Sequence, residues 1–103
     1  MSIATIEIQP RVVSVSLTAE MLTVVIQDGR IVSIPLEWYP RLQYATEAER
    51  ADWRVFEDAD GRDIIFWEGV DEFIPLIALL AGVPSRESAQ SLEKWLEARN
   101  DPQ

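Results

Sequence analysis

Residues 22–36 read L-T-V-V-I-Q-D-G-R-I-V-S-I-P-L and predict a β-hairpin. Leu22, Val24 and Ile26 occupy every second position of the first half, which is the pattern of a half-buried strand. Asp28 and Gly29 follow, and this dipeptide is a strong signal for a hairpin turn. We therefore expect the fold to be built outward from a pair of antiparallel strands.

The length of the hairpin loop decides which side chains share the buried face. A two-residue turn mixes polar and apolar side chains on that face. A three-residue loop at residues 28–30, with the glycine in the left-handed region, places Ile26 opposite Val32 and Val24 opposite Ile34. Because a one-residue slip turns every side chain over, we predict the longer loop with a bulge. The apolar face then holds Leu22, Val24, Ile26, Val32, Ile34 and Leu36.

Two further segments on either side of this hairpin have strand patterns. Residues 11–18 alternate between apolar and hydroxyl side chains, which predicts a strand whose inner face carries Val13, Val15 and Leu17. Residues 54–57 and 63–67 predict a second hairpin that turns at Asp60-Gly61. The tripeptide D-G-R thus occurs at both turns, and we interpret this as shared turn chemistry rather than as an internal repeat.

Helix signals complete the prediction of an α+β domain. Thr46 and Glu49 form a capping box that opens a short helix over residues 47–53. After an acidic loop, Pro75 begins a helix over residues 76–81 that Gly82 ends. Ser85 caps a last helix over residues 84–99. We expect one domain, residues 1–103, with a small antiparallel sheet built from hairpins over residues 11–82, a short helix after the third strand, and one or two C-terminal helices.

Composition narrows the classes of function. The chain contains no cysteine and no histidine, so the thiolate nucleophile, the zinc finger and the commonest general base are excluded. The net charge of -9 arises from eighteen acidic and nine basic residues. Such a charge disfavours nucleic acid and favours a basic partner, although it also serves solubility alone. We expect a soluble cytoplasmic protein without a secretory signal or membrane helix.

The central block resembles a family of small bacterial proteins, domain-of-unknown-function family 2442 (DUF2442). Its pattern is D-G-R, a strand ending in P-L, W-[FY]-P-R-L, A-T-x-x-E-R, a later tryptophan and L-L-x-G, over about residues 11–82. The matching positions are Asp28, Gly29, Arg30, Pro35, Leu36, Trp38, Tyr39, Pro40, Arg41, Leu42, Ala45, Thr46, Glu49, Arg50, Trp53, Trp67, Leu79, Leu80 and Gly82. Where the family often has I-H-W-P, this chain has I-F-W-E at residues 65–68.

The resemblance implies a short α+β domain with an antitoxin-like role, because members are often encoded beside a small toxin-like protein. Some longer relatives carry a DNA-binding helix-turn-helix, and we expect none here because only one helix is predicted after Gly82. The missing histidine and proline of the I-H-W-P motif put polar chemistry at that position in doubt.

Four aromatic residues and two arginines form a candidate binding constellation, namely Trp38, Tyr39, Trp53, Trp67, Arg41 and Arg50. Aromatic side chains and arginine dominate protein-binding hot spots, and arginine stacks on aromatic rings. Such a cluster holds a cation, a base or a partner's side chain. The alternative is structural, with the rings filling the core margin and the arginines bracing the loops. Both interpretations stay open at this point.

Acidic residues crowd into residues 57–72 and offer a second candidate, comprising Glu57, Asp58, Asp60, Asp63, Glu68, Asp71 and Glu72. An EF-hand does not fit, because its first and last ligand positions would fall on Phe56 and Trp67. The remaining readings are a solvated turn, an acidic docking surface or a divalent-metal site. Trp95, on the predicted last helix, either packs in the core or contacts a second copy or a partner.

We therefore expect a non-enzymatic protein-binding domain, an antitoxin-like partner of a small basic toxin encoded nearby. It is expected to use no cofactor, no metal, no direct nucleic-acid contact and no membrane, and homodimerisation stays open. The predicted partner-binding residues are Trp38, Tyr39, Arg41, Arg50, Asp58, Asp60, Asp63, Glu68 and Trp95. The alternatives are a ligand-sensing or scaffold domain with an aromatic-arginine pocket, and a carboxylate enzyme with a divalent metal at Asp58, Asp60 and Asp63.

Overall fold

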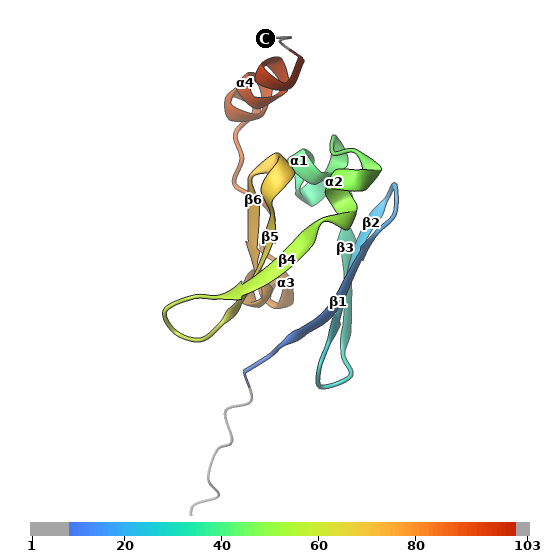
Figure 1. The fold of residues 1–103 in the computed structure, drawn as a ribbon, viewed down its shortest axis with the longest axis vertical. Coiled ribbons are helices and arrows are strands. Elements are labelled where there is room, and N and C mark those ends of the chain that lie inside the picture. The colour runs from blue at the N-terminus through green and yellow to red at the C-terminus, as the bar shows by residue number, and fades with distance from the viewer. Residues whose placement is uncertain (1–8, 101–103) are drawn as a thin grey trace, which may run out of the picture.

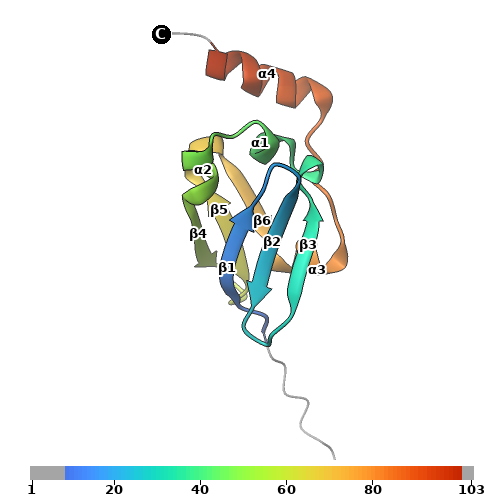
Figure 2. The same cartoon turned by 90° about the vertical axis from the view of Figure 1, so that its right-hand side faces the viewer.

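Two three-stranded antiparallel sheets form the body of the molecule in the computed structural model, which describes residues 9–100 (Figure 1). The first sheet has the order β1-β2-β3, and the second has the order β4-β5-β6. Figure 2 shows the first sheet in front of the second. The strands are β1 (Val12–Leu17), β2 (Met21–Ile26), β3 (Ile31–Pro35), β4 (Trp53–Glu57), β5 (Asp63–Trp67) and β6 (Glu72–Pro75). The predicted α+β class is confirmed, with two sheets of three strands.

Short helices connect the strands and the two sheets. Along the chain, the segment from β3 to β4 contains the 3-10 turn η1 (Leu36–Trp38), α1 (Pro40–Gln43) and α2 (Glu47–Ala51). The second sheet contains η2 (Glu68–Val70), and α3 (Leu76–Ala81) and α4 (Ala89–Asn100) follow it. Both hydrogen bonds of the predicted capping box at Thr46 and Glu49 are present, but α2 ends at Ala51. The prediction of helix through Trp53 is wrong because Trp53 pairs with Trp67 as the first residue of β4.

The first hairpin has the predicted loop length at a different position. Its loop is residues 27–29, since the Ile26 amide donates to the Arg30 carbonyl at 2.9 Å. Val24 therefore lies opposite Val32, and the predicted pairs Val24–Ile34 and Ile26–Val32 are wrong. In this loop type the left-handed residue comes last, so Gly29, with φ 97°, must end the loop. The shift is two residues, so the predicted apolar face is preserved.

The second hairpin repeats this loop geometry. The Asp58 amide donates to the Arg62 carbonyl at 2.9 Å, and the Gly61 amide donates to the Asp58 carbonyl at 3.0 Å. Gly61 has φ 76° and ends a loop of residues 59–61, as Gly29 ends the first. The predicted turn at Asp60-Gly61 is confirmed, and the shared D-G-R corresponds to shared turn geometry.

A bulge at the start of β1 removes Val13 from the predicted inner face of that strand, while Val15 and Leu17 lie against the core as predicted. The register shifts between Val12 and Ser14, and Val13 is left 57% exposed. Val12 takes its place against the core. The Val12 amide donates to Asp63 Oδ2 at 2.8 Å, so a side chain from the second sheet holds the bulged end of the first.

The core lies between the two sheets and includes the residues that connect them. Inward side chains of both sheets are fully or nearly fully buried, as are Leu36, Leu42 and Leu79 from the connecting helices. The buried members contributed by the strands are Val15, Leu22, Val24, Ile26, Ile34, Ile65, Trp67 and Ile74. A single shared core of this kind makes the two sheets one folding unit.

The C-terminal part of the chain differs from the prediction in two places. The segment read as an acidic loop contains η2 and the strand β6, separated by Asp71 in the left-handed conformation with φ 52°. The last helix begins at Ala89 rather than near Pro84, because Ser88 Oγ accepts from the Ser91 amide at 3.0 Å and caps it. No residue of α4 is buried. The helix lies across one end of the body (Figure 1).

Candidate functional site

The four residues of the predicted aromatic cluster serve separate parts of the structure. Trp67 is 0% exposed, and its Nε1 donates to the Arg50 carbonyl at 3.2 Å. Tyr39 is buried, and its hydroxyl donates to the Val83 carbonyl at 2.8 Å. Trp38 and Trp53 pack against the margin of the core. Within residues 9–100 the interacting aromatic pairs are all formed by phenylalanines, so these four rings make no cage.

The two arginines of that constellation brace the chain. Arg50 Nε donates to the Leu42 carbonyl at 3.0 Å, and its Nη2 donates to the Gln43 carbonyl at 2.8 Å. Arg41 donates to both carboxylate oxygens of Glu87. These contacts tie α2 to the end of α1 and hold the segment before α4. The arrangement favours the structural interpretation for both arginines.

Trp95 is engaged by the domain itself. The Arg41 guanidinium lies 5.3 Å from the centre of the Trp95 ring, and the Arg99 guanidinium lies 4.7 Å from it. Arg99 also donates to both oxygens of Glu49 at 3.0 and 2.8 Å. This hydrogen bonding from Arg99 lowers the pKa of the Glu49 carboxyl to about 2. Polar contacts and cation–π stacking therefore attach α4 to the body.

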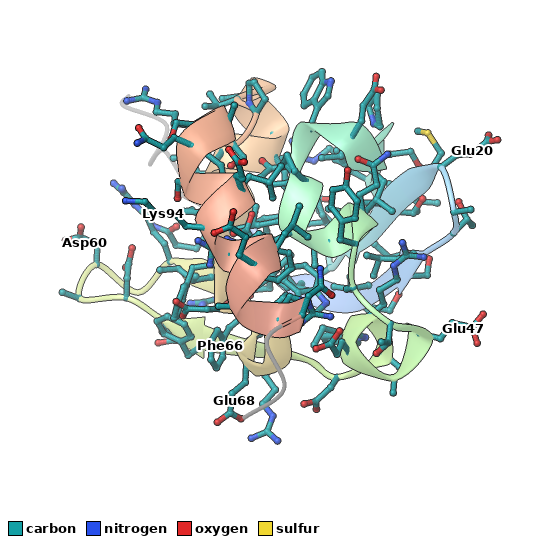
Figure 3. All side chains as sticks on the ribbon, turned by 90° about the horizontal axis from the view of Figure 1, so that it is seen from above. Glu20, Glu47, Asp60, Phe66, Glu68 and Lys94 are labelled. Atoms are coloured by element: carbon teal, nitrogen blue, oxygen red, sulfur yellow. The ribbon has the colours of Figure 1, made fainter. Side chains whose placement is uncertain are left out.

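The acidic residues of the second hairpin make different contacts and do not form one site. Asp58 Oδ1 accepts from the Asp60 and Arg62 amides at 2.8 and 3.0 Å, and the Arg62 amide is the main cause of its lowered pKa. Asp63 is buried and bound by Arg11 at 2.8 Å. Asp60 stays exposed at the hairpin tip, as Figure 3 shows. In the described part of the chain, no three potential metal ligands converge.

A surface that the sequence reasoning missed lies on the outward side of β4, β5 and β6. Phe66 and Phe73 stack with ring centres 4.5 Å apart, and Phe56 meets each of them edge-on at 6.3 and 6.1 Å. Phe56 is 42% exposed and Phe73 is 50% exposed. We call this surface, with the neighbouring Ile64, the aromatic face. Exposed contiguous aromatic side chains of this kind mark interaction sites.

Strand alternation explains why these rings point outward. Val55 and Ile65 form an inward pair, while Phe56 lies opposite Ile64 and Phe66 opposite Phe73. Two of the outward rings could have been predicted from the sequence. Side chains alternate along a strand, so Phe56 and Phe66 point away from the core when Val55 and Ile65 point into it. The third ring, Phe73, was missed because the strand β6 was not predicted, and the residues before Pro75 were assigned to an acidic loop.

The segment that carries the aromatic face is rich in acidic residues. Residues 52–75 contain eight acidic residues and two basic residues, whereas residues 11–35 contain two of each. Glu68 and Asp71 are exposed, and Figure 3 places Phe66 beside Glu68, with Asp60 at the tip of the same sheet's hairpin. Glu20, at the turn of the first sheet, lies on the opposite side. The surface thus combines aromatic rings with an acidic border formed by Asp60, Glu68 and Asp71, and the exposed Arg54 of β4 lies opposite Phe66.

Comparison with known proteins assigns the chain to a family. The model of a family described as "Protein of unknown function (DUF2442)" matches residues 12–85, which is most of the chain. The protein belongs to the DUF2442 family. This confirms the resemblance found in the sequence. Among curated proteins no relative matches this chain.

One solved structure is similar to this DUF2442 domain. It is the crystal structure of a protein of unknown function from Rhodospirillum rubrum ATCC 11170, with 20% sequence identity and a TM-score of 0.57. The similarity covers 77% of this chain and 94% of that one. It supports the fold alone. Within residues 9–100, the DUF2442 domain has no helix long and apolar enough to cross a bilayer.

A carboxylate beside the aromatic face has an unusual environment. Glu72, on β6, shares a cavity of about 220 Å³ with Tyr39 and Phe73. Burial raises the pKa of the Glu72 carboxyl to about 7, partly offset by the Arg41 charge, and burial also raises the pKa of the Tyr39 hydroxyl to about 12. The charge of this DUF2442 domain next to Phe73 therefore changes near neutral pH.

The residues of the predicted aromatic-arginine pocket do not line one common pocket, but two of them line a groove between α2 and β1. Of the predicted pocket residues, Trp53 and Arg50 line it, together with Glu47 and residues 15–19 of β1 and its turn. Its volume is about 480 Å³. Trp38, Tyr39 and Trp67 are not part of this groove.

Proposed function

We propose that this DUF2442 domain is a non-enzymatic protein-binding domain that captures a small basic protein on its aromatic face. The observation that carries the proposal is the set of three contacting phenylalanines, two of them about half exposed, inside a segment with eight acidic and two basic residues. Rings of this kind supply binding free energy when they are desolvated. The acidic border selects cationic partners and accelerates their encounter.

The antitoxin-like role implied by the family resemblance agrees with this surface. A toxin that acts on nucleic acid presents basic residues, and an acidic domain docked over them blocks access to its substrate. The chain has no histidine or cysteine to support a catalytic role. In this proposal Asp60 and Glu68 contact the partner in the cytoplasm, whereas Arg41, Arg50, Asp63 and Trp95 maintain the fold that presents the surface.

We expect a neighbouring gene to encode a small basic protein, and the test uses that protein. The two purified proteins are titrated calorimetrically at low and at physiological salt, and the neighbour is expressed alone and together with the DUF2442 protein. We expect a complex whose affinity falls as salt rises, and relief of any growth arrest on co-expression. No detectable complex at low salt, together with growth arrest that co-expression leaves unchanged, would overturn the proposal.

A further inference from the structure

The four edge strands of the two sheets differ in how they resist pairing with another chain. β3 and β6 each end in a proline, Pro35 and Pro75, and β4 carries Arg54 and Glu57. Prolines and charges are the usual protection of sheet edges. β1 reads V-V-S-V-S-L and has neither a proline nor a charged residue. Its edge is therefore the least protected of the four.

Hydrogen-bonding groups of β1 point away from its partner strand. The Thr18 amide donates to the Met21 carbonyl at 2.9 Å, which makes Thr18 and Met21 a hydrogen-bonded pair. Hydrogen-bonded pairs alternate along an antiparallel ladder, so Ser16–Thr23 is the next such pair, and Val15–Val24 and Leu17–Leu22 lie between the bonds. The amide and carbonyl groups of Val15 and Leu17 consequently face the open edge.

That open edge borders the groove beside α2. The groove of about 480 Å³ is lined by Val15, Leu17, Arg50 and Trp53, among others. Figures 1 and 2 show β1 at the border of the first sheet, on the side where β4 and α2 lie. Asp63 already binds the amide of Val12, so the free edge begins after the bulge. Room and hydrogen-bonding groups for one short extended segment coincide here.

We propose that an extended segment of the protein partner adds to β1 as a fourth strand and fills this groove. This inference rests on the proposed function, since the segment belongs to the same basic partner. Helix α2 contacts β1 and its residues wall the groove, so the segment lies between α2 and the edge of β1. Alternate apolar side chains of the segment pack on Val15, Leu17 and Trp53, and basic flanks suit the net charge of -9 and Glu47 in the groove wall.

Overlapping 12-residue peptides that cover the small basic neighbour are the probe. Each is titrated into the full-length protein, and amide hydrogen exchange is followed by NMR for the best binder. We expect added protection of the Val15 and Leu17 amides. N-methylation of alternate peptide residues should abolish binding for one set of positions and spare the other set. Loss from both sets alike, or unchanged exchange at Val15 and Leu17, would overturn strand addition.

Matched variants test the edge from the side of the protein. Leu17→Pro removes an outward amide, Leu17→Ala removes only the side chain, and Ser33→Pro removes an outward amide from the opposite edge of the same sheet. We expect Leu17→Pro to weaken the peptide about fivefold to tenfold relative to Leu17→Ala, with Ser33→Pro within about twofold of the wild type. Equal effects of the two proline variants would contradict the proposal. Circular dichroism verifies folding, and the N-methyl series decides the matter where Leu17→Pro fails to fold.

Three outcomes separate this inference from the proposed function. If the neighbour binds while no peptide does and the two amides stay unprotected in the complex, strand addition is wrong and protein binding stands. If neither the neighbour nor any peptide binds, both proposals fail. If the β1 amides of the free protein become protected as its concentration rises, a second copy occupies the edge and the partner segment does not.

Discussion

The two sheets share one architecture and differ on their outward sides. Each is a three-stranded antiparallel meander whose D-G-R hairpin has a three-residue loop ending in a left-handed glycine. Each turns a row of fully buried aliphatic side chains toward the same core. The outward side of the first sheet has a hydroxyl pair, Thr23 and Ser33, at 2.7 Å. The outward side of the second has three contacting phenylalanines.

This contrast separates what builds the fold from what remains for interaction. The inward faces of both sheets contribute aliphatic side chains to the same core, which does not require an aromatic outer surface on either sheet. Residues 52–75 contain eight acidic and two basic residues, an excess of six acidic residues. Residues 11–35 contain two of each kind and carry no net charge. Solubility does not explain the exposure of Phe56 and Phe73. We infer that the outward side of the second sheet, and not the outward side of the first, carries the interaction.

Truncating one inward side chain on each sheet tests whether the two share a core, and this is the largest stability effect expected. Leu22→Ala and Ile65→Ala each remove a side chain that is 0% exposed. Each should lower the free energy of unfolding by about 2–5 kcal/mol, measured by urea denaturation. Ile31→Ala, at a position 65% exposed, is the control and should change it by less than about 0.5 kcal/mol. A large loss in one sheet alone would contradict the shared core.

The two loop glycines test whether the hairpins are equivalent. Gly29 and Gly61 have positive φ, and a Cβ at either position meets nothing within 4 Å. Gly29→Ala and Gly61→Ala should therefore each cost about 1–2 kcal/mol through backbone strain alone. Thermal unfolding of both variants measures this. A cost in one hairpin and none in the other would show that the D-G-R loops are not equivalent.

Titration of Glu72, on β6, tests a further difference between the two sheets, because the strands of the first sheet contain no carboxylate. The folded-state pKa of Glu72 is raised to about 7, so the folded state holds this proton more tightly than the unfolded chain. Stability from this group is present at low pH and falls as pH rises from about 4.5 toward 7. After discounting for solvent screening, Glu72→Gln should stabilise the protein by about 1 kcal/mol at pH 8 and by little at pH 4.

Glu49 supplies the matched opposite case. Its folded-state pKa is lowered to about 2, chiefly by hydrogen bonding from Arg99. Its contribution is therefore present at neutral pH and is lost as pH falls from about 4.5 toward 2. Across pH 2 to 8, both Glu49→Gln and Glu72→Gln should approach the wild type at the acidic end and depart from it at neutral pH, where Glu49→Gln is less stable and Glu72→Gln more stable than the wild type. Parallel curves would contradict the environments described for the two carboxylates.

Sequence patterns predicted the strands well because burial imposes a period of two. Leu22, Val24 and Ile26 are buried as expected, and a register error of two residues at the first hairpin left every face correct. The bulge at Val13 could not be predicted from the local sequence. The hydrogen bond beside it runs from the Val12 amide to the carboxylate of Asp63, which is far along the chain. Strand β6 escaped prediction because residues 71 and 72 are acidic and look like a loop.

The candidate site was harder to predict than the fold. The sequence made tryptophan, tyrosine and arginine conspicuous, yet Trp67, Tyr39 and Arg50 are used for burial and bracing. Which aromatic residues remain exposed depends on how two sheets and α4 pack together. The acidic segment was recognisable from composition, but its division into a loop cap at Asp58, an ion pair at Asp63 and an exposed tip at Asp60 depends on tertiary contacts.

Calorimetric titration of the basic neighbour against two matched triple variants tests the central claim most directly. One variant replaces Phe56, Phe66 and Phe73 with serine. The other replaces Val13, Val25 and Ile31, on the outward side of the first sheet, with serine as well. We expect the phenylalanine variant to stay folded and to lose at least about 100-fold in affinity, while the first-sheet variant stays within about threefold of the wild type. Equal affinities of the two variants, or a greater loss from the first-sheet variant, would contradict the central claim.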